Sequence, residues 1–116
     1  MIETIVLNYL LGLNISGIGQ NVFAEVPVTP PASYIVLEKT ASGAQDKIHS
    51  ALIAVQSYSK NSLLEAAQIN AAVVEAMEEM SDTVDAIYSC KLNSDYNFTN
   101  PETREYRYQA VFNLYY

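Results

Sequence analysis

The residues that could do chemistry in this chain of 116 residues are few: one cysteine, one histidine and a run of carboxylates. A nucleophilic site would pair Cys90 or a serine with His49 and with an acid that orients the imidazole. Cys90 and His49 lie far apart in the sequence, and no G-x-S-x-G or C-x-x-C motif surrounds them. We therefore expect Cys90 to be a small buried hydrophobe and His49 to be a half-buried or interface residue of a strand. A hydrolase that uses either residue is the weakest alternative.

Five carboxylates follow one another in the second half of the chain and raise the alternative of a divalent metal site. They are Glu75, Glu78, Glu79, Asp82 and Asp85. Hard cations usually take six or more oxygen ligands that a loop arranges, and no ligand-rich loop follows this run. The pattern favours a solvated helix face or a negatively charged wall, with no metal and no other cofactor.

The charge balance argues against a protein dedicated to binding nucleic acid. The chain has 13 acidic and 6 basic residues, which gives a net charge of −7. A negative surface repels phosphate, although nucleic acid can still pass nearby without being held. The start lacks the basic region of a signal peptide, and the apolar runs are too short for a membrane span. A single cysteine also suits a reducing compartment, so we expect no membrane partner.

Hydrophobic periodicity predicts two helices and five strands in the order α-β-β-β-α-β-β. The helices are expected over 2–12 and over 62–80, where Ser62 and Glu65 have the spacing of a capping box. The expected strands cover residues 22–26, 33–39, 47–60, 84–98 and 104–116, with turn chemistry at 40–46. The mixed faces of 47–60 indicate a strand that is covered on both sides for part of its length.

The last two strands are joined by about five residues, so they are expected to be antiparallel neighbours. In the closing strand one face is apolar and is expected to meet the second helix. That face comprises Tyr106, Tyr108, Ala110, Phe112 and Leu114. The sequence therefore predicts one α+β domain over 1–116, an antiparallel sheet with helices on one face.

Nine tyrosines are the other notable feature of the composition. Tyrosine is enriched at protein interfaces because it combines a large area with a polar tip, but in a chain without tryptophan it also serves in the core. The apolar side of the second helix is wider than a single sheet-facing stripe needs. Both features fit an assembly module better than an enzyme. The candidate residues for a subunit contact are Tyr106, Arg107, Tyr108, Tyr115 and Tyr116.

Along nearly its whole length the chain resembles the small tail terminator, or tail-completion, proteins of long-tailed bacteriophages and prophages. Similar proteins open with a short helix, here IETIVLNYLLG, and continue with a strand that ends in proline, here within NVFAEVPVTPPASYIVLE. A long strand then leads into a helix with frequent Ala and Glu, here NSLLEAAQINAAVVEAMEEM. They close with a hairpin whose last strand carries Tyr and Arg, here DYNFTNPETREYRYQAVFNLYY.

The resemblance implies a structural role in the virion, at the head-proximal end of the tail, after assembly in the host cytoplasm. Such proteins form rings, typically hexameric, that cap the tail tube and join it to the head–tail connector. DNA slides through their lumen without specific binding, and the lumen is often acidic; the five carboxylates are its candidates here. Two alternatives stay open: a head-completion or stopper-type connector protein, and a domain that binds a small ligand between the second helix and the sheet.

Overall fold

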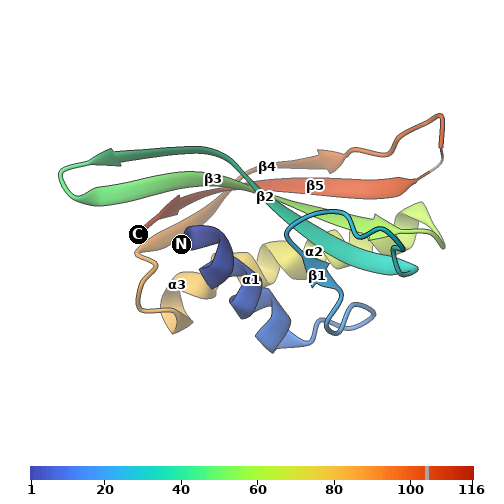
Figure 1. Ribbon diagram of the computed structural model, residues 1–116, viewed down its shortest axis with the longest axis horizontal. Coiled ribbons are helices and arrows are strands. Elements are labelled where there is room, and N and C mark those ends of the chain that lie inside the picture. The colour runs from blue at the N-terminus through green and yellow to red at the C-terminus, as the bar shows by residue number, and fades with distance from the viewer. Residues whose placement is uncertain (104) are drawn as a thin grey trace.

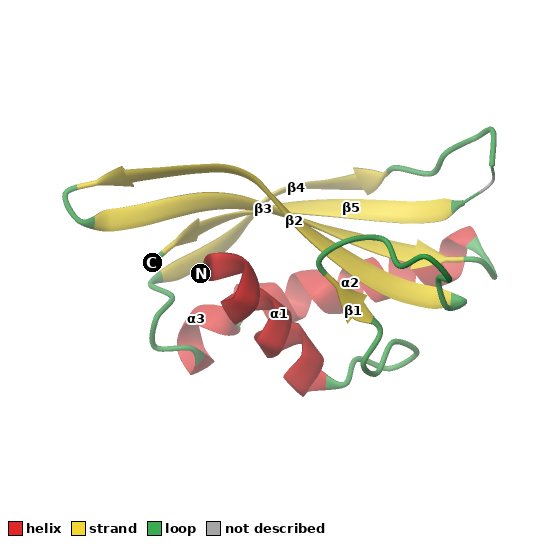
Figure 2. Cartoon of the chain, in the orientation of Figure 1, coloured by secondary structure: helices red, strands yellow, loops and turns green. Residues whose placement is uncertain are grey.

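The structure, a computed structural model, describes residues 1–103 and 105–116 and places a layer of helices against one face of a five-stranded sheet (Figures 1 and 2). The fold class is α+β, as predicted. Arg104, the first residue of the expected closing strand, lies outside the described residues. The elements are α1 (Ile2–Leu13), β1 (Val22–Phe23), β2 (Ser33–Gln45), β3 (Ile48–Ser59), α2 (Leu63–Glu78), α3 (Met80–Thr83), β4 (Ser89–Asn97) and β5 (Tyr106–Tyr115).

The strands lie in the order β1-β2-β3-β5-β4. β2, β3, β5 and β4 form antiparallel pairs, so the prediction that the last two strands are antiparallel neighbours is confirmed. β1, however, runs parallel to β2, which makes the sheet mixed and corrects the predicted all-antiparallel sheet. The reason is the proline-containing segment 24–32, which crosses over to the start of β2 instead of closing a hairpin (Figure 1).

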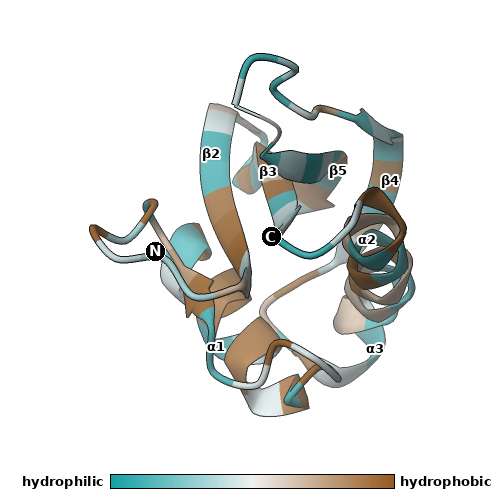
Figure 3. Ribbon diagram, turned by 90° about the vertical axis from the view of Figure 1, so that its right-hand side faces the viewer, coloured by the Kyte–Doolittle hydropathy of each residue, from teal (hydrophilic) through white to brown (hydrophobic). Residues whose placement is uncertain are grey.

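The main core lies between the helices and the sheet. α1 contributes Ile2, Val6 and Leu10, which recur at helical spacing, and all three are buried. From the sheet, Ala110, Phe112 and Leu114 of β5 alternate toward the helices and are completely buried, as predicted for the apolar face of this strand. Figure 3 looks along the molecule and shows both layers, with hydrophobic segments on α1, β2, β3 and α2.

Most of the wide apolar side of α2 is buried against other elements of the same chain. Its buried residues are Ala66, Ile69, Asn70, Val73 and Met77. Val74 is half-buried and packs against the same core, so the extra width is mainly taken up by neighbouring elements. Leu63 and Leu64, at the start of the helix, are the exposed exceptions.

A smaller core lies on the sheet face that points away from the helices. Tyr34, Val36 and Tyr58 are buried there, with Phe23 at its edge. All residues of β3 from Ile53 to Ser59 are consequently buried, which confirms that this strand is covered on both sides for part of its length.

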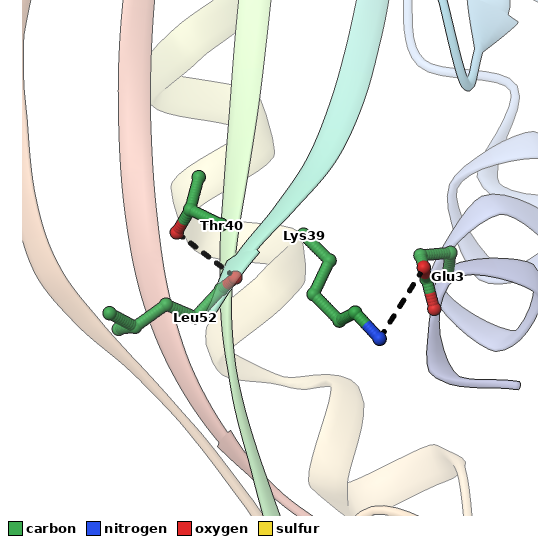
Figure 4. Close-up of polar contacts among 4 residues, drawn as sticks. All are labelled: Glu3, Lys39, Thr40 and Leu52. Atoms are coloured by element: carbon green, nitrogen blue, oxygen red, sulfur yellow. Dashed lines mark hydrogen bonds and ion pairs between the residues drawn. The ribbon is translucent and has the colours of Figure 1, made fainter. Parts of the chain in front are cut away.

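The segment predicted as a turn, 40–46, instead continues β2 as a strand. Thr40 sits at a bulge, where its hydroxyl donates a hydrogen bond to the carbonyl of Leu52 at 3.3 Å (Figure 4). The turn proper falls at Asp46 and Lys47, whose φ values of 52° and 67° suit a tight hairpin. The small polar residues of 40–45 therefore belong to a long hairpin and not to its turn.

The start of one strand and the capping of one helix also differ from the sequence-based prediction. β4 begins at Ser89 and not at 84, because residues 80–83 form α3, whose Met80 is buried, and a turn follows. Only half of the predicted capping box forms. The amide of Glu65 donates to Ser62 Oγ at 3.1 Å, but the Glu65 carboxylate accepts from Ser33 and Asn61 instead of from the cap amide.

Candidate functional site

The five carboxylates expected to line a lumen are all exposed. They lie on the second half of α2, on α3 and on the turn that follows, in the helical layer on one side of the sheet. Within residues 1–103 and 105–116, no group of three or more metal-binding side chains is arranged to hold an ion. All five acids are therefore solvated, at the C-terminal end of α2 and in the segment that follows it.

The residues expected at a subunit contact differ in how accessible they are. Tyr115 is 47% exposed, whereas Tyr116 is half-buried, packs against the main core and stacks on His49 with ring centroids 5.4 Å apart. His49 itself is exposed, which rules out the half-buried alternative for this strand residue and leaves the interface alternative as a prediction. The remaining three candidates are all half-buried: Tyr106, Arg107 and Tyr108.

The Arg107 side chain packs against aromatic side chains on the sheet face opposite the helices. Its guanidinium carbon lies 4.3 Å from the ring centroid of Phe98 and 5.5 Å from that of Tyr58. Nη1 donates to the Tyr58 hydroxyl at 3.1 Å, and Nε donates to the carbonyl of Phe98 at 2.9 Å. Tyr58 in turn stacks on Tyr34, with centroids 4.4 Å apart and planes only 6° from parallel.

Burial raises the pKa of the Tyr34 hydroxyl to about 12, and the nearby charge of Glu105 acts in the same direction. Tyr34 is therefore a neutral member of the stack across the physiological range. The arrangement joins β2, β3 and β5 through side chains as well as through the backbone ladder, so its first role is to stiffen the sheet.

A chain of hydrogen bonds continues from the same stack across three strands. The Tyr58 hydroxyl donates to Gln56 Oε1 at 2.9 Å, and Gln56 Nε2 donates to Gln109 Oε1 at 2.8 Å. Gln109 Nε2 then donates to the Tyr96 hydroxyl at 2.5 Å. Sequence reasoning missed this network, because Gln56 lies opposite Gln109 only in the observed register of β3 and β5.

A hollow with a volume of about 670 Å³ lies between the loop after α1, the start of β2 and the start of α2. We call it the Glu65 groove, since Glu65 is its charged residue among the described lining. Ser33 and Asn61 donate hydrogen bonds to this carboxylate and hold its pKa below the usual value, so it stays ionised at neutral pH. The lining comprises Ile15, Ser16, Gly17, Asn21, Ala32, Ser33, Asn61, Glu65, Gln68, Ile69 and Ala72.

The hairpin formed by the end of β2 and the start of β3 projects from the opposite end of the molecule (Figure 1). We call residues Ala41–His49 the β2–β3 arm. At its base Lys39 makes an ion pair with Glu3 of α1 at 3.7 Å (Figure 4). Beyond this pair every residue of the arm is exposed, so neither sheet face of the arm is covered by the helices.

Cys90 fulfils the prediction of a small buried hydrophobe. It is buried in the main core, and burial raises the pKa of its thiol to about 12, with the charge of Glu78 adding to the effect. A neutral, buried thiol is a poor nucleophile, while His49 lies exposed on the arm. The geometry therefore offers no support for a site that uses Cys90 with His49. No helix in the described part of the chain is both long and apolar enough to cross a membrane.

Comparison with known proteins gives a match at the level of structure. The fold is similar to that of a chain in the structure described as "Virion of native gene transfer agent (GTA) particle", with a TM-score of 0.65 and 15% sequence identity. The match covers 96% of this chain and 83% of the other. At this identity the similarity establishes a shared fold. No protein-family model matches the chain, and no curated protein sequence is significantly similar to it.

Proposed function

We propose that this chain is a non-enzymatic structural protein of a phage-like virion, and more specifically a tail terminator. In this role copies of the chain form a closed ring, with six subunits as in the family it resembles. The ring caps the finished tail tube at its head-proximal end and offers a surface to the head–tail connector. Subunits would be made in the host cytoplasm and incorporated into the virion.

The observation that carries this proposal is the extent of the structural similarity. The matching chain belongs to a virion particle, and the likeness extends over 96% of the present chain and 83% of the other. A match of this extent involves the helical layer and the sheet together and not one common motif. Fold alone does not define function, so the assignment also depends on the surfaces described below.

The surface has features that favour assembly. β4 forms one edge of the sheet, and β2 is paired on its outer side only at Ile35 and Val36, by β1, among the described residues. Free strand edges are a liability for a monomer unless something covers them. Large apolar side chains are also exposed, including Val28 at 102% and Tyr88 at 69%. Two different edges and scattered apolar side chains suit the heterologous contacts from which rings are built.

The acidic surface is the proposed lining of the lumen. Its five carboxylates are all exposed, and the net charge of the chain is −7. A lumen that repels phosphate lets DNA slide through because no backbone contact holds it. We place Tyr115 at the proposed subunit contact, since it is the most exposed of the five candidate residues. Tyr116 is half-buried beside it, and the half-buried Tyr106, Arg107 and Tyr108 lie at the other end of β5.

Binding to purified particle components tests the proposal. Purified protein is mixed with tail tubes that lack their own terminator and, separately, with DNA-filled heads that carry the connector but no tail. The proposal expects the protein to sediment with the tubes and to appear at one end of each tube. Binding to the heads alone would contradict the terminator role and favour the head-completion alternative, and binding to neither would contradict both.

A further inference from the structure

The β2–β3 arm is unusually open for a segment of regular sheet. All nine residues from Ala41 to His49 are exposed, although the backbone ladder between the two strands continues to the turn. The base of the arm is three-stranded, because β5 pairs with β3 up to Ser50 and Tyr116 bonds to His49. Beyond it the hairpin has only two strands, and a two-stranded hairpin that is exposed on both faces is only marginally stable in water. The arm therefore has the properties of a segment that is covered in an assembly.

The outer edge of the arm is also poorly protected against pairing. Residues 41–45 read Ala-Ser-Gly-Ala-Gln and carry no charge. At the other sheet edge, β4 has a bulge after Leu92 and the charged residues Lys91 and Asp95, which are typical devices against edge pairing. One side of the arm is also hollow: a depression of about 580 Å³ lies between Gly43, Ser50 and Tyr115.

The Glu65 groove lies at the end of the molecule opposite the tip of the arm (Figure 1). The chain measures 44 Å along its longest axis and 26 and 24 Å across it. An arm that points away from the groove cannot fill the groove of its own chain. A contact between the arm of one copy and the groove of the next would instead be head-to-tail, which is the type of contact that closes rings.

One pair of opposite charges can meet between the two surfaces. Within the described lining, Glu65 is the charged residue of the groove, and its carboxylate is held ionised by Ser33 and Asn61. The turn of the arm presents Lys47 next to Asp46, and both residues are exposed. Complementary charges of this kind fix the register of an interface.

We propose that the β2–β3 arm of one copy docks in the Glu65 groove of the next copy, with Lys47 facing Glu65. This inference rests on the proposed ring-forming function and supplies a contact for it. The partner is thus a second copy of this chain, and the arm is ordered by the neighbouring subunit that covers it.

Disulfide crosslinking tests the contact directly. In a Cys90→Ala background, Gln45→Cys beside the turn is combined with Gln68→Cys in the groove; both positions are exposed and neither is charged. Oxidation of assembled protein should give a ladder of covalent oligomers on a denaturing gel. The matched control pairs Gln45→Cys with Glu75→Cys, two turns further along α2 and about 10 Å away, outside the groove. Equal crosslinking of the two pairs, or none of the first, would overturn the contact.

Charge exchange provides a second test that does not require new cysteines. Lys47→Glu and Glu65→Lys should each raise the protein concentration needed for half-assembly by about tenfold or more, because like charges then meet. The double variant should return it toward the wild-type value, even if Glu65→Lys lowers the melting temperature. Lys91→Glu, an exposed lysine away from the arm, should have little effect. Wild-type assembly by Lys47→Glu would overturn the proposal.

The outcomes separate this contact from the tail-terminator role. Rings that cap tail tubes but give no specific crosslink overturn the arm–groove contact and leave the virion function in place. Specific crosslinks in a protein that never binds tail tubes support the contact and overturn the terminator role.

Discussion

Arg107 holds together the sheet face that the helices leave uncovered. It stacks between Phe98 and Tyr58 and donates hydrogen bonds to both residues. A cation between two aromatic rings gains from both, and its planar guanidinium fits this site better than an ammonium group would. The residue first considered for a subunit contact is therefore already engaged within its own chain.

Arg107→Ala should lower the free energy of unfolding by about 1–3 kcal/mol, because it removes the stack and leaves the Tyr58 hydroxyl without its donor. Arg107→Lys should recover only part of the loss. Urea unfolding followed by circular dichroism measures both. Lys91→Ala, at an exposed position, is the matched control and should change little. An Arg107→Ala variant as stable as the control would show that the stack is incidental.

The raised pKa of Cys90 predicts how the free energy of unfolding changes with pH. Its ordinary pKa of 9.0 is raised to about 12 in the fold, first by burial. Below pH 9 both the folded and the unfolded thiol keep the proton, so its contribution to stability is complete. Between pH 9 and about 12 only the unfolded thiol ionises, and this contribution is lost as the pH rises.

The free energy of unfolding should consequently fall less between pH 9 and 11 in Cys90→Ala than in the wild type, while Tyr34 contributes equally to both. Ellman's reagent at pH 8 should label the wild-type thiol quickly in denaturant and very slowly without it. Rapid labelling of the native protein would contradict the burial of Cys90 and reopen its alternative as a reactive thiol.

At the scale of elements, hydrophobic periodicity predicted a helix or strand correctly wherever its apolar residues are the ones buried in the fold. The helix expected over 2–12 is α1, Ile2–Leu13, and the apolar face of β5 packs against α2 as predicted. The β2–β3 arm was missed because the small residues of 40–45 are common in turns, while the observed turn depends on positive φ at Asp46 and Lys47. Small residues exposed on both faces carry no burial signal that separates a strand from a loop.

The candidate site was predictable only in part for the same reason. The exposure of Glu75, Glu79 and Asp82 follows from their helical spacing on one face. The Glu65 groove and the side-chain network of Gln56 and Gln109 depend on which segments lie side by side in space. A single sequence fixes neither strand order nor register, and the parallel pairing of β1 shows how one crossover changes the edge of the sheet.

The end of β5 is predicted to be essential for the stability of the sheet. Deleting residues 113–116 removes Leu114, which is completely buried, and the two backbone hydrogen bonds between Tyr116 and His49. The free energy of unfolding should fall by about 3 kcal/mol or more, since loss of a buried leucine alone costs about 2–5 kcal/mol. Thermal melting and assembly of the truncated protein are the measurements. Deleting Tyr116 alone is the control and should cost much less; a truncated protein that melts and assembles like wild type would disprove the integral role of this strand.

At the scale of the whole molecule, the two ends of its long axis differ. One end carries the exposed β2–β3 arm, and the other carries the Glu65 groove (Figure 1). The helical layer presents the acidic surface on one side of the sheet, while the other sheet face is stiffened by the Arg107 stack. A subunit with unlike ends and a charged side has the asymmetry that a ring with an acidic lumen requires. This is the basis on which we connect the fold to the proposed tail terminator.

Electron microscopy of the negatively stained protein, alone and after mixing with terminator-free tail tubes, tests this central claim most directly. The account predicts closed rings with a stain-filled central hole, either free in solution or seated on one end of each tube. Particles that stay monomeric at high concentration and leave the tube ends bare would contradict it.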